Sequence, residues 1–159
     1  MAATWTTPKT WVASEMATAA LFNTEIRDNL TWLKTPLESG IIEFATADFT
    51  TTSATYVDVT GCTTTITTRG GGLDVFLRIN WSGSIGTLQL VVDGVSEAIL
   101  GGIANANPIG ATLYHHIAAL SAGSHTIKAQ AKVSAGTLTI KGTTSTAGDP
   151  LFFVREAGG

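Results

Sequence analysis

The spacing of hydrophobic residues changes near residue 40 of this chain of 159 residues. Before residue 40, apolar side chains recur at every third or fourth position, which predicts a helix over residues 14–35. Ser14 is a suitable N-cap, and Glu15 lies in the first turn, where the helix dipole favours an acid. Pro36 ends the helix, because proline disfavours helical backbone angles in the residue before it.

After residue 40, short β-branched runs alternate with turn residues, which is typical of strands. Asp93 and Gly94 form the clearest turn, since both tolerate the positive φ of a type I′ hairpin. Strands are predicted near residues 42–49, 54–60, 62–68, 73–82, 86–92, 95–100, 111–120, 124–133, 136–142 and 150–155. The sequence therefore predicts a mainly β fold. We expect an antiparallel jelly-roll-like β-sandwich over residues 41–159, preceded by an N-terminal arm and one α-helix in residues 1–40.

The predicted helix carries a stripe with the spacing of a coiled coil. Its positions alternate by three and four residues: Met16, Ala19, Asn23, Ile26, Leu30, Leu33 and Leu37. Asn23 lies at an a position, where one polar residue can fix the register and the number of strands. An amphipathic helix packed on its own β-domain has the same periodicity, so both arrangements remain open.

The arm before the helix contains two tryptophans, Trp5 and Trp11, which are unusual in an exposed tail. The arm either folds back on its own domain or docks on a neighbouring subunit. We also hypothesise that Arg27, Asp28 and Asn29, which flank the stripe, form hydrogen bonds between subunits. The candidate residues for oligomerisation or anchoring are Trp5, Trp11, Met16, Asn23, Ile26, Arg27, Leu30 and Leu33.

Composition narrows the possible functions. Charged residues make up only 13% of the chain and the net charge is −3, so no basic surface for nucleic acid or anionic lipid is expected. Threonine, with 27 residues, favours strands over an all-helical fold. The single cysteine, Cys62, excludes an internal disulfide framework. Neither a signal peptide nor an apolar run long enough to span a bilayer is visible, so we expect a protein that is made and kept soluble inside a cell, or released from it by lysis, and no membrane partner.

The residues that could suggest catalysis or metal binding are better explained by structural roles. The glycines at 70–72 lack the Gly-Lys-Ser/Thr of a phosphate loop. His115 and His116 are adjacent, so on a strand they point to opposite faces. One of them could approach His125 if strands 111–120 and 124–133 pair, but a packed or solvated histidine is favoured over a metal ligand. No catalytic residue, metal site or cofactor is predicted.

Three aromatic residues could stack on a sugar ring: Trp32, Trp81 and Tyr114. Packing in the core or at a subunit interface is the favoured interpretation for them. Cys62 has no neighbouring base or cation in the sequence, so we expect a small buried side chain.

Several segments resemble small virion proteins of tailed bacteriophages, which serve as minor tail, fibre or head-decoration proteins. The matching segments are TPKTWVASE (7–15), AALFNT (19–24), RDNL (27–30), SATYVDVTG (53–61), AGSHTIK (122–128) and FVRE (153–156). The resemblance implies a non-enzymatic structural component of the virion, frequently a homotrimer, whose N-terminal part anchors it and whose β-domain faces outward. Its partners would be its own copies and other virion proteins of the capsid or tail.

An alternative function is a receptor-binding module that recognises a host-surface glycan or protein. For this alternative we expect residues 101–110 to form the binding loop. An enzyme, such as a glycan depolymerase, is disfavoured, because no pair of carboxylates stands out as acid and base.

Overall fold

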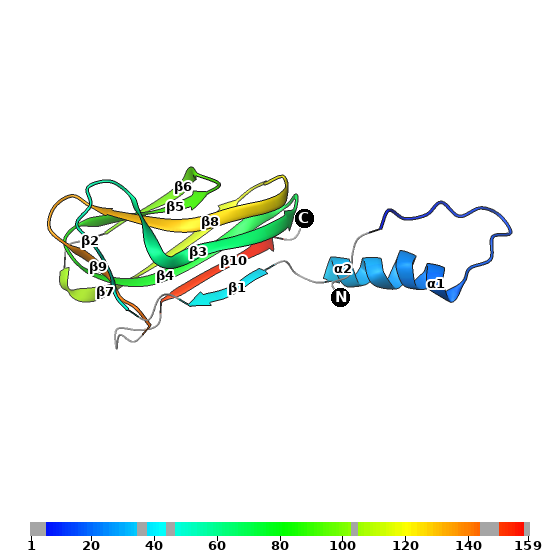
Figure 1. Ribbon diagram of the computed structural model, residues 1–159, viewed down its shortest axis with the longest axis horizontal. Coiled ribbons are helices and arrows are strands. Elements are labelled where there is room, and N and C mark those ends of the chain that lie inside the picture. Colours follow the sequence, from blue (N-terminus) through cyan, green and yellow to red (C-terminus); the bar gives the residue numbers. More distant parts are fainter. Residues whose placement is uncertain (1–5, 35–37, 44–46, 103–104, 144–149, 158–159) are drawn as a thin grey trace. The chain divides into compact units, whose positions relative to one another are not determined.

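Two antiparallel sheets form the β-rich part of the computed structural model, which confirms the predicted mainly β fold (Figure 1). The structure describes residues 6–34, 38–43, 47–102, 105–143 and 150–157. Within the chain, residues 1–36 and residues 37–159 form separate compact units. The β-unit includes strand β1, Glu38–Glu43, and so begins before the predicted boundary at residue 41.

The first sheet, sheet A, has β4 at its centre. On one side, β4 pairs with β7 along its length. On the other side, β10 pairs with the first part of β4 and β9 with its last part. β1 pairs in turn with β10, and β2 with β9. The second sheet, sheet B, has the order β3-β8-β5-β6. The bounds in sheet A are β1 Glu38–Glu43, β2 Phe49–Thr51, β4 Gly72–Gly83, β7 Asn105–Ile117, β9 Leu138–Ile140 and β10 Leu151–Ala157. Those in sheet B are β3 Val57–Arg69, β5 Gly86–Val92, β6 Val95–Gly101 and β8 Ala122–Val133.

The core lies between the two sheets and follows the alternation of side chains along each strand. On β4, every second residue from Leu73 to Ile79 is fully buried. On the facing sheet, β5 and β8 contribute a matching row of apolar side chains. The main core residues of these three strands are Leu73, Val75, Leu77, Ile79, Trp81, Leu88, Leu90, Val92, Ile127, Ala129, Ala131 and Val133. Most of the residues between them face outward, although Asn80 and Val91 are also buried.

The Asp93–Gly94 hairpin prediction is confirmed. Asp93 has φ 49° and Gly94 has φ 87°, and the pair Val92 and Val95 closes the two-residue turn between β5 and β6. Positive φ at both central residues is what a type I′ turn requires.

Three predicted strands and one predicted loop differ from the structure. The predicted strands 54–60 and 62–68 are one strand, β3, whose pairing with β8 shifts between Asp58 and Thr63, where Gly61 takes a φ of 82°. The shift inserts residues without ending the strand, as a β-bulge does. The predicted strand 42–49 is divided, since β1 ends at Glu43 and β2 begins at Phe49. The predicted loop 101–110 is largely strand, because β6 ends at Gly101 and β7 begins at Asn105.

The helix begins later than predicted. Ser14 has a φ of 69° and is not a cap, whereas the Thr18 hydroxyl accepts from the N–H of Leu21 at 3.2 Å. The helical segments are α1 Ala19–Phe22, a π-helical stretch η1 Asn23–Asp28, and α2 Asn29–Lys34. The wider π turn interrupts the regular coiled-coil spacing. None of the described helices has the length and apolar character needed to span a bilayer.

Close approach of β7 to the start of β4 explains why position 72 is glycine. A Cβ at Gly72 would lie 2.6 Å from the carbonyl oxygen of Ile117, a backbone atom that cannot move aside cheaply. We therefore expect Gly72→Ala to lower the free energy of unfolding by about 1–3 kcal/mol, measured by urea denaturation. Gly101→Ala is the matched control, because nothing lies within 4 Å of the added Cβ. Equal stability of the two variants would contradict this packing.

Candidate functional site

The N-terminal arm is tied to the helix of its own chain by Asn29, which is only 5% exposed. The Asn29 Oδ1 accepts from the backbone N–H of Thr6 at 2.9 Å and from its hydroxyl at 3.2 Å. The Asn29 Nδ2 donates to the carbonyl oxygens of Thr6 at 3.0 Å and Glu25 at 3.2 Å. The side-chain amide thus satisfies both backbone groups of one arm residue. This corrects the hypothesis that Asn29 bonds to another subunit, because its amide is already engaged.

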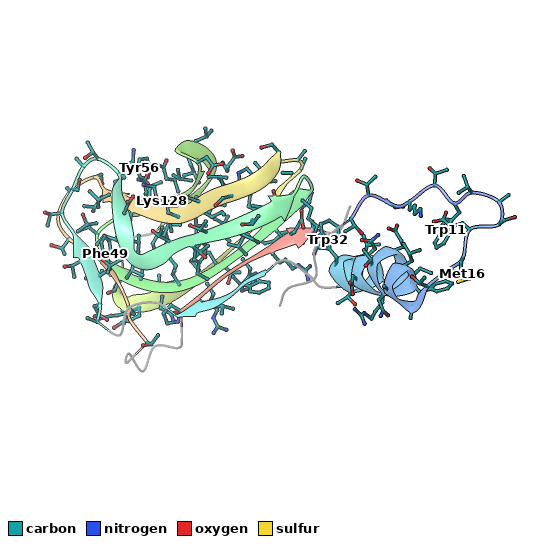
Figure 2. The ribbon with its side chains drawn as sticks, turned by 45° about the vertical axis from the view of Figure 1, so that its right-hand side comes forward. Trp11, Met16, Trp32, Phe49, Tyr56 and Lys128 are labelled. Atoms are coloured by element: carbon teal, nitrogen blue, oxygen red, sulfur yellow. The ribbon has the colours of Figure 1, made fainter. Side chains whose placement is uncertain are left out.

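Further contacts hold the arm along the helix. The N–H of Lys9 donates to Oε2 of Glu25 at 2.8 Å, and the Lys9 ammonium pairs with Glu15. The rings of Trp11 and Phe22 lie 6.3 Å apart between centroids, and the Lys9 Nζ lies 5.8 Å from the Trp11 ring (Figure 2). Of the two alternatives for the arm, its described residues therefore fold back on their own helix.

An apolar stripe remains open on the helix. It consists of Phe22, Ile26, Leu30 and Leu33, each between 46% and 59% exposed. The spacings of four, four and three residues place neighbouring members about one turn apart. The neighbouring face, which includes Glu25 and Asn29, receives the arm. We call these four residues the helix stripe.

The other predicted anchoring residues do not all belong to the helix stripe. Met16 is exposed but precedes the helix, and Asn23 is exposed at the start of the π-helical stretch. Arg27 donates from Nε to Oδ1 of the adjacent Asp28 at 2.9 Å, so it has an ion pair within its own chain. Trp5 lies outside the described residues. The heptad pattern missed Phe22, which is one residue before the predicted position 23.

The outer face of sheet A carries a second exposed group of side chains. Strand register places three rows across β7, β4 and β10, each with one residue from each strand. We call this nine-residue surface the A-face. Its rows are His116-Asp74-Arg155, Tyr114-Phe76-Phe153 and Thr112-Arg78-Leu151.

Asp74 is the centre of a hydrogen-bond cluster on the A-face. Its Oδ1 contacts Nδ1 of His116 and accepts from the Tyr114 hydroxyl, both at 2.8 Å. Its Oδ2 accepts from Nε of Arg155 at 3.3 Å and from Nη2 at 3.2 Å. The hydrogen bonds from His116 and Tyr114, together with Arg155, lower the pKa of Asp74, while Asp74 raises the pKa of Tyr114. The carboxylate therefore holds three side chains in place.

His125 has a structural role on β8, an inner strand of sheet B. It is buried, its Nδ1 lies 2.6 Å from Oδ2 of Asp93, and its Nε2 lies 2.8 Å from the carbonyl oxygen of Ser121. Both partners are acceptors, so the cationic ring suits this position. The bonds to Asp93 and Ser121 raise the pKa of His125, and His125 in turn lowers the pKa of Asp93. The ring links the β5–β6 hairpin to the segment before β8.

The histidines do not form a metal site in the described parts of the chain, where no three His, Cys, Asp or Glu side chains are placed around one ion. The condition under which one of them could approach His125, a pairing of strands 111–120 and 124–133, is not met, because β7 lies in sheet A and β8 in sheet B. His116 faces outward beside Asp74, whereas His115 is its neighbour on the other side of the strand.

Of the three candidate aromatic residues, Tyr114 exposes its ring most clearly, at 60%. Trp81 is buried, as expected for core packing, beside a cavity of about 170 Å³ lined by Trp81, Gly101, Gly102, Ile109, Gly110 and Ala111. Trp32 is half-buried in the N-terminal unit. Cys62 is fully buried, and this burial raises the pKa of its thiol, which confirms the expected packed side chain.

Comparisons with known proteins support the fold and leave the family open. No family model and no curated protein sequence matches the chain. Among solved structures, Eiger TNF from S. frugiperda superposes with a TM-score of 0.53 and 10% identity, covering 79% of this chain and 96% of that one. The sugar-binding C-terminal domain of EclA has a TM-score of 0.43 and 18% identity, covering 63% and 77%. A family 35 carbohydrate-binding module from an environmental isolate has a TM-score of 0.40 and 17% identity, covering 79% and 98%. The chain has a jelly-roll-like β-sandwich fold.

The Asn29 contacts predict that Asn29→Ala loosens the arm. The variant loses both partners of the Thr6 backbone, so we expect faster amide hydrogen exchange at residues 6–12 by mass spectrometry. Asn23→Ala is the matched control, because Asn23 is exposed on the same helix. Unchanged exchange in Asn29→Ala would contradict the arm contact.

The His125–Asp93 pair predicts a pH-dependent stability difference between the natural chain and His125→Gln. The raised pKa of His125 means that its contribution is complete below the unfolded value of about 6.5 and is lost as the pH rises through the folded value. The lowered pKa of Asp93 means that its contribution is lost as the pH falls below about 4. The difference in melting temperature should be largest near pH 5 and smaller at pH 8. In an Asp93→Asn background this pH dependence should become smaller, with the Ser121 carbonyl accounting for what remains; an unchanged pH dependence would mean that another group is responsible.

Proposed function

We propose that this chain is a non-enzymatic structural component of a tailed-phage virion, of the minor tail, fibre or capsid-decoration type. It assembles as a homotrimer and attaches to the particle through its N-terminal arm and helix. The observation that carries this proposal is the helix stripe, a row of four apolar side chains that stay about half exposed even though Phe22 at one end lies beside Trp11 of the arm. The segments that resemble phage virion proteins, such as residues 7–15, add support for the particle.

The helix stripe has the properties of an association surface. Full burial of one such side chain is worth about 1.5–3 kcal/mol, so four of them favour contact with another apolar surface. The neighbouring face of the helix is already engaged by the arm, and the Asn29 amide needs no further partner. The apolar side chains are therefore exposed to solvent, while the polar groups beneath the arm have hydrogen-bond partners. A second and a third copy provide matching stripes.

The β-unit supplies a separate, self-contained body. Its core is closed between two sheets, with side chains such as Leu77 and Ile127 fully buried. Such a unit needs no association to fold, so its outer surfaces can face the surroundings of the particle. Location on the virion surface is part of the proposal.

A second candidate function is recognition of a host-surface receptor by the β-unit. The exposed Tyr114 on the A-face favours it, since an aromatic ring of this exposure is available to a ligand. The expected loop at residues 101–110 does not, because most of this segment is in β7.

Self-association through the helix stripe predicts the effect of Leu30→Asp. We expect the purified natural chain to have the mass of a trimer by light scattering and Leu30→Asp to have that of a monomer, since a buried charge at the interface is costly. Ile85→Asp is the matched control, an exposed apolar residue of the β-unit, and should remain trimeric. Arg27→Ala tests whether Arg27 contributes bonds between subunits. A monomeric natural chain, or equal masses for Leu30→Asp and the control, contradicts the association.

The role in the particle has its own test. Phage particles assembled with a tagged chain should show the tag on the head or tail by immuno-electron microscopy, and Leu30→Asp should remove it. Particles that carry no tag while the tagged natural chain is expressed contradict the virion assignment.

A further inference from the structure

We propose that the A-face binds a glycan built of uncharged pyranose units, with Tyr114, Phe76 and Phe153 as the stacking row. This inference rests on the second candidate function, receptor recognition, and does not depend on assembly through the helix stripe. It moves the binding surface from the expected loop to the outer face of a sheet.

The aromatic row has a shape suited to a chain of sugar rings. Tyr114, Phe76 and Phe153 lie directly opposite one another on β7, β4 and β10. Neighbouring strands are about 4.8 Å apart, so the row extends over about 10 Å. Tyr114 is the most exposed, while Phe76 and Phe153 are half-buried. The row therefore forms a flat apolar strip on the sheet with a raised ring on β7, against which the C–H face of a pyranose can stack.

The row beside it supplies directional polar groups. Asp74 fixes the Tyr114 hydroxyl and the Arg155 guanidinium, which is exposed and uses Nε and Nη2 for this contact. The Nη1 group takes no part in the contact with Asp74, and we assign its N–H groups to a ligand hydroxyl. A sugar requires this combination, because its ring has an apolar face and a rim of hydroxyl groups. Since the cluster is already formed, binding orders few side chains.

The charge of the Asp74 cluster favours an uncharged ligand, while Arg78 in the third row is the one further Arg, Lys, Asp or Glu of the A-face and has an interaction of its own. The Asp74 carboxylate and the Arg155 guanidinium balance one another in an ion pair at 3.2 Å. Covering this pair with the flat surface of another protein would remove its water, which is costly. Glycan hydroxyls can replace that water with hydrogen bonds and leave the outer side of Arg155 hydrated. The A-face therefore suits a glycan better than a second copy of this chain.

The outer face of sheet B provides an internal comparison. There, Gln130 donates to Asp58 at 2.6 Å and accepts from Gln89 at 2.6 Å, so polar side chains bond to one another across the strands. The Tyr56 ring is covered by Lys132, whose Nζ lies 4.5 Å from the ring centroid. Figure 2 labels Tyr56 and Lys128, which belong to this side of the sandwich. Among its described side chains, the outer face of sheet B thus has no row of aromatic residues that lie opposite one another on neighbouring strands. It is therefore a suitable control surface.

The test uses the full chain and an array of oligosaccharides of glucose, galactose, mannose, rhamnose and N-acetylglucosamine, with galacturonic acid oligomers as the charged comparison. We expect binding to at least one uncharged oligosaccharide, little affected by salt. Tyr114→Ala should weaken it about tenfold, since aromatic stacking contributes about 1.4 kcal/mol. Tyr114→Phe, which keeps the ring, should retain most of the affinity. Ile99→Ala removes an exposed apolar residue of sheet B and should have no effect.

Three results would overturn the proposal. The first is the absence of binding to every uncharged oligosaccharide of the array, and the second is equal weakening by Tyr114→Ala and Ile99→Ala. The third is a change of mass in Tyr114→Ala by light scattering, which would make the A-face a contact between copies. Each leaves the Leu30→Asp result unaffected, so failure of glycan binding and failure of helix-stripe assembly are distinguishable.

Discussion

The alternation of side chains on β4 is the constraint on which the β-unit depends. This strand pairs with β7, β10 and β9, so its register sets the positions of three neighbours. Its inward residues, such as Val75 and Leu77, are fully buried against sheet B. Asp74 and Phe76 alternate with these inward residues and therefore face outward, where they lie in the middle of the A-face between β7 and β10. A shift of one residue would exchange the two sets, so burial of the core also fixes the exposed surface.

Short sequence patterns predicted the features whose conformation depends only on adjacent residues, such as a tight turn. Asp93 and Gly94 specify their turn by backbone preference alone, and the prediction is confirmed. The helix start was misplaced because Ser14 and Thr18 are equally plausible caps, and only the backbone conformation distinguishes them. The prediction of two strands where β3 is one was also wrong, because a bulge at Gly61 and a turn look alike in sequence.

The candidate surfaces required long-range contacts that no short pattern contains. Asn29 meets Thr6 across 23 positions, and Tyr114 meets Asp74 across 40. The helix stripe could be predicted in part, since its spacing is visible, but the π-helical stretch brought in Phe22 instead of Asn23. The structure therefore gives the two units different exposed surfaces: an apolar stripe on the helix, for which we propose association, and an aromatic face fixed by the sheet.

Hydroxyl-radical footprinting of side chains at low and high protein concentration tests this division most directly. The account predicts that labelling of Phe22, Leu30 and Leu33 falls as the chain associates, while labelling of Tyr114 and Phe76 does not change. Protection of Tyr114 with rising concentration, or constant labelling of the helix stripe in an associated chain, would contradict the account.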